Sequence, residues 1–174
     1  MSCFAAPPER AALCESCHGP GGNSTTRSIP SIAGQPVTFL ENQLVFFREG
    51  LRNAPVMQPL MQGAKDEDIT ALARHFSAQA VRSEKLAGAQ DAVIARGKEL
   101  AGKLHCGQCH LPDYQGRAQM PRLAGQREDY LVEAMIGYRD GKRTGADTTM
   151  SEVLYGAGDA DIRALGAYLA RLPP

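Results

Sequence analysis

Apolar residues recur at three- and four-residue intervals in two matched stretches of the chain, residues 36–50 and 127–141. This spacing places the apolar side chains on one face of an α-helix, and a glycine ends each stretch where a helix would stop. The apolar positions are Phe39, Leu40, Leu44 and Phe47 in the first stretch, and Tyr130, Leu131, Met135 and Tyr138 in the second. The pattern predicts an amphipathic helix in each.

A second matched pair of stretches, residues 65–79 and 158–172, opens with acidic residues, which suit the positive end of a helix dipole. Residues 91–110 predict a further helix that runs into a cysteine motif, and the corresponding helix in residues 6–18 is shorter. The alternation of β-branched residues typical of strands is absent, so the expected fold class is all-α. The apolar stripes of the pair are Ile69, Leu72, Ala73 and Phe76, then Ile162, Leu165, Gly166 and Leu169.

The matched stretches belong to one unit that occurs twice. Residues 29–53 are identical to residues 120–144 at 8 of 25 positions, an offset of 91, and the cysteine motifs and last helices are offset by 92 and 93. Such near-constant offsets indicate a duplicated unit. Two copies are too few for a solenoid. They predict two similar domains, 1–80 and 91–174, joined by a linker over 81–90.

Charge and composition exclude several classes of partner. The 19 basic residues balance the 19 acidic ones, so neither nucleic acid nor an anionic membrane surface is expected as a partner. No apolar run approaches the roughly 18 residues of a membrane-spanning helix, and residues 1–10 do not form an intact export signal. Two domains of about 80 residues would have modest cores, which a large apolar cofactor in each would enlarge.

Each unit carries two cysteines three positions apart with a histidine directly after the second. Zinc sites built from two such pairs usually separate them by about 15–20 residues, whereas 88 residues separate these pairs. A thiol–disulfide pair of the thioredoxin type follows a strand, which the pattern does not predict. Haem attachment uses all three residues, as two thioethers and an iron ligand. We therefore predict two covalently bound haem c groups, at Cys14, Cys17 and His18 and at Cys106, Cys109 and His110.

The sixth iron ligand is predicted from the repeat. Methionine thioether is a common partner of histidine on haem iron. Met57 and Met150 lie eight residues before Lys65 and Gly158, which correspond to each other in the repeat, so these two methionines are the predicted ligands. Met61 corresponds to a leucine and is expected to fill the core. Met120 and Met135 are likewise interpreted as packing residues.

A ligating histidine needs an acceptor for its other ring nitrogen. Pro30 and Pro121 follow the two motif histidines by 12 and 11 residues, at matching positions of the repeat, and their carbonyl groups are the predicted acceptors. The alternative is that both are ordinary turn prolines. His75 is expected on a helix surface, and His105 is assigned no role.

In residues 14–24, 29–35, 46–52, 106–110, 121–131 and 138–150, the chain resembles dihaem cytochromes c of the cytochrome c4 family. The resemblance covers nearly the whole chain and implies two tandem helical cytochrome c domains with haem edges facing across a pseudo-two-fold interface. It places the covalent attachments and the axial pairs, His18 with Met57 and His110 with Met150, on the residues predicted above. It also implies a periplasmic protein that carries electrons to a terminal oxidase.

The chain departs from that family in two respects. Its first domain lacks most of the N-terminal helix, and Cys3 lies outside both motifs. Cys3 is a candidate lipid-anchor site, which would be the only route to a membrane, or forms an intermolecular disulfide, or is a remnant.

Two functions from different classes compete with a free electron carrier. One is the electron-accepting cytochrome subunit of a sulfur-compound dehydrogenase, either a flavocytochrome sulfide dehydrogenase or the partner of a thiosulfate dehydrogenase. The other is a dihaem peroxidase, which needs an iron with a displaceable or absent ligand. A methionine candidate in each half argues for two six-coordinate irons and hence against an enzyme.

Overall fold

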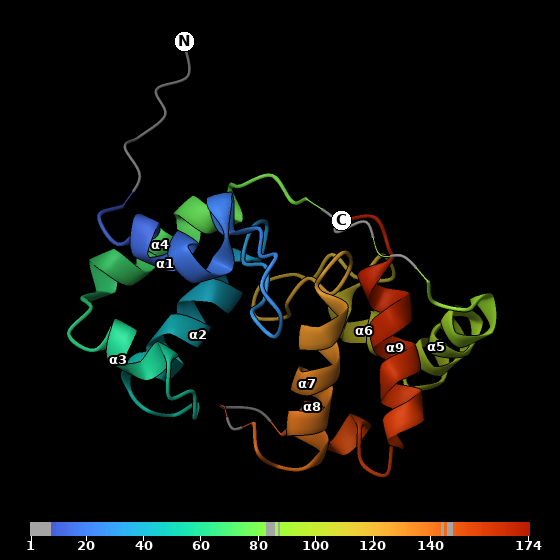
Figure 1. The fold of residues 1–174 in the computed structure, drawn as a ribbon. Coiled ribbons are helices and arrows are strands. Elements are labelled where there is room, and N and C mark those ends of the chain that lie inside the picture. Colours follow the sequence, from blue (N-terminus) through green and yellow to red (C-terminus); the bar gives the residue numbers. More distant parts are fainter. Residues whose placement is uncertain (1–7, 83–85, 87, 144, 146–147) are drawn as a thin grey trace.

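The computed structural model describes residues 8–82, 86, 88–143, 145 and 148–174, and these residues form helices and connecting loops with no strand. The all-α prediction is confirmed. The helices form two lobes, α1–α4 and α5–α9 (Figure 1). The first lobe contains α1 (Ala11–His18), the 3₁₀ turn η1 (Pro20–Gly22), α2 (Val37–Arg48), α3 (Met57–Met61) and α4 (Asp66–Ser77). The second contains α5 (Asp91–Lys103), α6 (Cys106–His110), α7 (Glu128–Arg139), α8 (Thr149–Val153) and α9 (Asp159–Ala170).

The four helices expected from apolar periodicity are α2, α4, α7 and α9, and both predicted stripes of α4 and α9 are buried. Matching ion pairs fix how these helices meet in each lobe. The last turn of α2 bonds the start of α4 through Arg48 and Asp66 at 2.8 Å. Arg139 and Asp159 join α7 to α9 in the same way, at 2.6 Å. The repeat in sequence is therefore a repeat in structure.

The helix that leads into the second cysteine motif differs from the prediction. It was expected to continue to the motif, but α5 ends at Lys103 and α6 begins at Cys106. His105 has a φ of 54°, in the left-handed region that ends helices and that histidine adopts more readily than most residues. His105, to which the sequence assigned no role, therefore lies at the break between α5 and α6.

The two lobes have differently organised cores. In the second lobe a single cluster of buried side chains joins α5, α7 and α9 and includes Leu154, which follows α8. In the first lobe the buried side chains form two smaller clusters, one around Leu72 and Phe76 and the other around Phe47 and Met61. Within the described residues the first lobe has no helix preceding α1 that would correspond to α5. The shorter opening helix expected from the sequence is confirmed.

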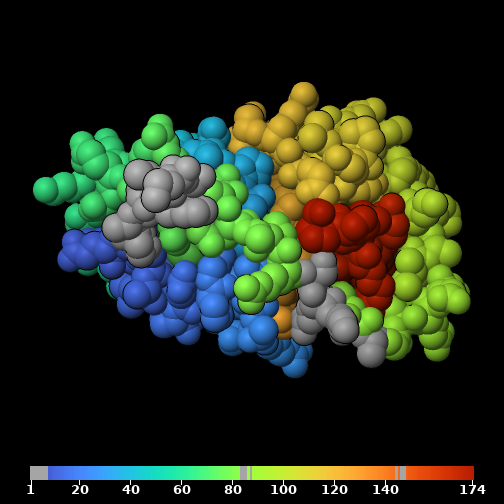
Figure 2. Space-filling view, turned by 90° about the horizontal axis from the view of Figure 1, so that it is seen from above, coloured from blue at the N-terminus to red at the C-terminus, as the bar shows by residue number. Residues whose placement is uncertain are grey.

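The lobes meet through a reciprocal pair of glutamines in the loops that precede α2 and α7. The side chain of Gln35 bonds both the N–H (2.9 Å) and the carbonyl oxygen (3.0 Å) of Arg122. Gln126 bonds both backbone groups of Ser31, each at 2.8 Å. Gln35 and Gln126 lie 91 positions apart in the sequence, and so do Ser31 and Arg122, the residues that they bond. The contacts are therefore those of a pseudo-two-fold interface. Figure 2 shows the light-blue residues of the first lobe against the gold ones of the second.

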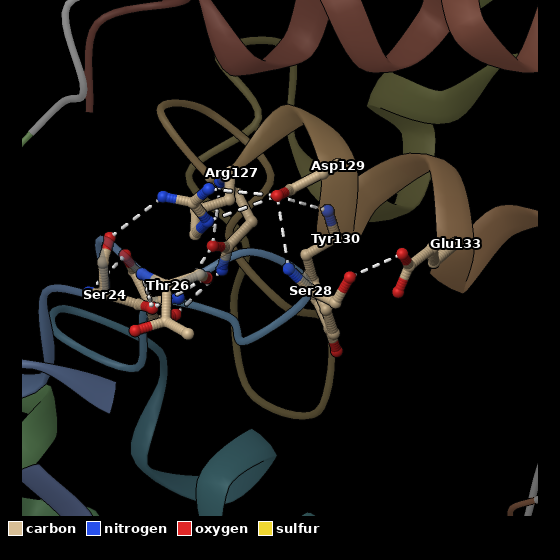
Figure 3. A network of polar contacts seen from close by, with 9 residues as sticks. Ser24, Thr26, Ser28, Arg127, Asp129, Tyr130 and Glu133 are labelled. Atoms are coloured by element: carbon tan, nitrogen blue, oxygen red, sulfur yellow. Dashed lines mark hydrogen bonds and ion pairs between the residues drawn. The ribbon is translucent and has the colours of Figure 1, made fainter. Parts of the chain in front are cut away.

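A second set of contacts across the interface (Figure 3) has no symmetry-related counterpart among the described residues. The Asp129 carboxylate, at the start of α7, accepts the N–H of Ser28 at 3.2 Å and an Arg127 N–H at 2.9 Å. The hydroxyl of Ser28 donates to Glu133 at 2.5 Å, and Arg127 reaches the carbonyl of Ser24. The N-terminal end of α7 therefore holds the loop over residues 24–28.

The structure leaves two sequence predictions as they stand. The domain limits stay a prediction, and part of the predicted linker, 83–85 and 87, lies outside the described residues, as does Cys3. No helix in the described part of the chain is both long and apolar enough to cross a membrane.

The close packing of α5 on α9 predicts opposite effects for two glycines of the same helix. A Cβ at Gly97 would collide with the carbonyl of Ala164 and with Tyr168, whereas one at Gly102 would meet nothing within 4 Å. Gly97→Ala should therefore lower the free energy of unfolding by about 1–3 kcal/mol through overpacking. Gly102→Ala, the matched control, should raise it by about 0.5–1 kcal/mol because alanine favours a helix interior. Chemical denaturation measures both, and equal effects would contradict this packing.

Candidate functional site

The first cysteine motif occupies the last two turns of α1. Cys14 is half-buried, Cys17 is exposed, and His18 ends the helix with only 7% of its surface exposed. Residues three and four apart share a helix face. The motif therefore presents two thiols and an imidazole from one short stretch of helix.

The second motif occupies α6, separated from α5 by the turn at His105. Its side chains repeat the first arrangement: Cys106 is half-buried, Cys109 is exposed and His110 is 4% exposed. The motif therefore keeps its local geometry although one copy continues a helix and the other begins after a break. This is expected if the chemistry of the motif depends on the spacing of its two cysteines and its histidine.

Both motif histidines are held by the predicted proline carbonyls. Nδ1 of His18 lies 2.8 Å from the carbonyl oxygen of Pro30, and Nδ1 of His110 lies 2.9 Å from that of Pro121. A carbonyl oxygen only accepts, so Nδ1 carries the proton and Nε2 keeps its lone pair. Burial lowers the pKa of both imidazoles below the ordinary histidine value, although the bond to proline opposes this. Each ring is thus held neutral, in the tautomer that a metal ligand requires.

The Nε2 atom of His110 provides an independent test of the haem interpretation. It is buried and has no hydrogen-bond partner among the described residues. Buried polar atoms of native proteins are almost always paired, and an orphan needs an explanation such as an unseen ion or group. Coordination of a haem iron would satisfy this atom.

The cysteines do not have the properties of a thiol–disulfide pair. All four motif cysteines are free, and burial raises the pKa of the Cys14 and Cys106 thiols. Redox-active pairs instead lower the pKa of one thiol to stabilise its thiolate. Metal-binding clusters of three or more His, Cys, Asp or Glu side chains are also absent from the described residues.

Met57, Met61 and Met150 differ in their burial. Met57 begins α3 and Met150 lies at the start of α8, and both are half-buried at the edges of their cores. Met61 is 3% exposed and its counterpart Leu154 is 2% exposed, so the prediction that Met61 fills the core is confirmed. Met61 is enclosed by protein, whereas Met57 and Met150 keep part of their surface exposed.

His75 differs from its prediction. It was expected on a helix surface but is half-buried, with its ring 4.9 Å from that of Phe76 in an edge-on contact. Its Nε2 is buried and unpaired among the described residues. His75 directly precedes Phe76, a residue of the buried apolar stripe of α4, and its ring packs at the edge of the core.

Sequence reasoning missed the groups that surround the proline acceptors. Gln35, Gln126 and Arg122 are 2–3% exposed and form the interface directly beside Pro30 and Pro121. The signal was present, because Ala-Gly-Gln is one of the few runs identical in both halves, at 33–35 and 124–126. A polar residue kept identical between two copies that otherwise differ points to a role in both.

Comparisons with known proteins agree with this geometry. The family model for cytochrome c matches residues 94–173. The chain is 30% identical to cytochrome c4 of Pseudomonas aeruginosa, over 97% of this chain and 88% of that protein. It is 33% identical to the thiosulfate dehydrogenase electron acceptor of Thiomonas intermedia, over 97% and 82%.

Solved structures give the same result in three dimensions. Reduced cytochrome c4 from Pseudomonas stutzeri superposes with a TM-score of 0.86 at 30% identity, covering 97% of this chain and 100% of that one. Thiosulfate dehydrogenase from Marichromatium purpuratum superposes with a TM-score of 0.79 at 28% identity, over 92% of this chain and 36% of that one.

Proposed function

Because this chain belongs to the cytochrome c4 family and binds two haem c groups covalently, we propose that it carries single electrons between periplasmic redox proteins. The observation that carries the proposal is the duplicated histidine–proline geometry, which holds two imidazoles neutral with Nε2 free. A single histidine–proline site would not by itself indicate electron transfer. Two equivalent ones, in lobes that share an interface, suit electron passage along the chain.

The residues fit the haem groups as follows. Cys14 and Cys17 form the thioethers of the first haem, and Cys106 and Cys109 those of the second. The iron of the first haem would be held by His18 and Met57, and that of the second by His110 and Met150. When bound, each haem iron accepts and releases one electron. The protein's part would be to bind the group covalently, hold the imidazole through the proline carbonyl and supply a methionine thioether as the second ligand of the iron.

Six-coordinate irons distinguish a carrier from an enzyme. With a histidine and a methionine on each iron there is no open position for a substrate, so no bond-making chemistry is proposed. Carbon monoxide should accordingly bind the reduced protein slowly and in substoichiometric amounts at neutral pH, because it must displace a ligand held by the fold. Visible spectra recorded under carbon monoxide measure this. Rapid stoichiometric binding would indicate an open iron and favour a peroxidase.

A second candidate function is supported by named relatives. Two thiosulfate dehydrogenase electron acceptors are 33% and 29% identical to this chain over more than 90% of its length. The alternative proposal is therefore an electron-accepting partner of such a dehydrogenase, in place of a carrier that delivers to a terminal oxidase. Mixing the oxidised protein with a thiosulfate dehydrogenase and thiosulfate would separate the two, because only the partner is reduced within the enzyme's turnover time. A lipid anchor at Cys3 remains part of the proposal for either function.

A further inference from the structure

We propose that each domain tunes the haem iron of the other through a hydrogen-bonded chain that ends in an interface glutamine. Gln126 of the second domain acts on the first iron, and Gln35 of the first domain acts on the second. The two glutamines are positioning residues, whose side chains bond the backbone groups of Ser31 and Arg122 and not the histidines. The inference rests on the proposed ligation by His18 and His110.

The first chain passes through a single peptide group. The carbonyl of Pro30 accepts the Nδ1–H of His18 at 2.8 Å. The N–H of Ser31, which belongs to the same planar peptide unit, donates to Oε1 of Gln126 at 2.8 Å. Imidazole, peptide and glutamine amide are therefore linked in series, and the bond between Ser31 and Gln126 is buried.

The second chain repeats the first with the domains exchanged. The carbonyl of Pro121 accepts the Nδ1–H of His110 at 2.9 Å, and the N–H of Arg122 in the same peptide unit donates to Oε1 of Gln35 at 2.9 Å. The bond between Arg122 and Gln35 is also buried. The exchange follows from the pseudo-two-fold interface, because the loop that holds each histidine is completed by the opposite lobe.

Hydrogen bonds in series strengthen one another, by an amount on the order of 10–30% per bond. When the glutamine oxygen accepts the peptide N–H, the peptide is polarised and its carbonyl becomes a better acceptor for the imidazole N–H. A stronger bond at Nδ1 makes Nε2 a stronger donor to iron, which favours the ferric state. Removing the glutamine acceptor should therefore raise the reduction potential of the haem in the opposite domain.

The test uses the holoprotein in a Met150→His background, in which the second haem has the lower potential and the two reduction waves separate. Gln35→Leu should raise only the lower wave and Gln126→Leu only the upper one. The expected size is roughly a threefold change in the ratio of reduced to oxidised haem at a fixed potential, or about 30 mV for one electron. In the reduced Gln35→Leu protein the Nδ1 proton resonance of His110 should also move upfield, as its hydrogen bond weakens.

Three control variants separate the chain of bonds from a loosened interface. Asp129→Ala breaks the contact with Ser28 across the same interface and should leave both waves in place. Gln35→Glu and Gln126→Glu keep an acceptor oxygen and should leave the potential of the opposite haem unchanged or lower it, which keeps the proposal testable if a leucine variant does not fold.

Any of several results would overturn the proposal: a shift confined to the haem of the mutated domain, equal shifts of both haems, or a glutamate variant that raises the potential as leucine does. No shift in either leucine variant would overturn it as well. Failure of the underlying ligation would be visible separately, because the Met150→His parent would then show no separated second wave.

Discussion

Replacing Cys106 and Cys109 together with alanine should reduce the covalently bound haem from two groups per chain to one. The thioether bonds are the part of the attachment that survives unfolding, whereas a histidine and a methionine hold a haem only while the fold is intact. Acid–acetone extraction followed by a haem count per chain measures the result. The haem that remains should be the one bound at Cys14 and Cys17.

The matched control is Cys3→Ala, which removes a cysteine outside both motifs and should leave two haems per chain. The reverse double variant, in Cys14 and Cys17, should leave the second haem in place. Loss of both haems from either double variant would mean that the two domains do not mature independently. Retention of both after extraction would refute thioether attachment at these cysteines.

Met150→His should lower the potential of the second haem by on the order of 0.1–0.3 V, within the span of about 0.8 V that axial ligands cover. Imidazole donates to iron more strongly than a thioether does and favours the ferric state, so the iron stays low-spin while its potential falls. A redox titration followed by visible spectra measures the shift. The weak near-red band of methionine–iron ligation should lose the contribution of the second haem.

The corresponding comparison in the first domain uses two methionines of the same short helix. Met57→Leu should abolish the methionine–iron band of the first haem, whereas Met61→Leu should leave both haem spectra nearly unchanged, because Met61 is enclosed in the core. Loss of the band in Met61→Leu with its retention in Met57→Leu would place the ligand one helical turn away from the proposed position.

The helices and the candidate ligands could be predicted because their signals are local and occur twice. Apolar spacing defines α2, α4, α7 and α9, and the cysteine motifs place three groups on one turn of helix. Correspondence between the repeats then separated Met57 from Met61, a distinction that a single copy would not have supplied. The predicted bonds from Pro30 and Pro121 rested on the same correspondence.

The interface could not be predicted because its contacts join residues about 90 positions apart and depend on how two loops meet. Nothing local to Gln35 indicates that its partner is a backbone group of the opposite domain. The helix break at His105 was missed because apolar spacing does not reveal a single residue with left-handed backbone, as His105 has. His75 was misplaced because periodicity predicts which face a residue lies on and not how far the core extends around it.

The central claim is that this chain holds two haems by covalent bonds, one in each copy of the repeat. The most direct measurement is the mass of the denatured holoprotein, taken intact by mass spectrometry under conditions that release every non-covalent ligand. The account predicts the mass of the chain plus two haem groups. The mass of the chain alone, or of the chain with two disulfides, would contradict it.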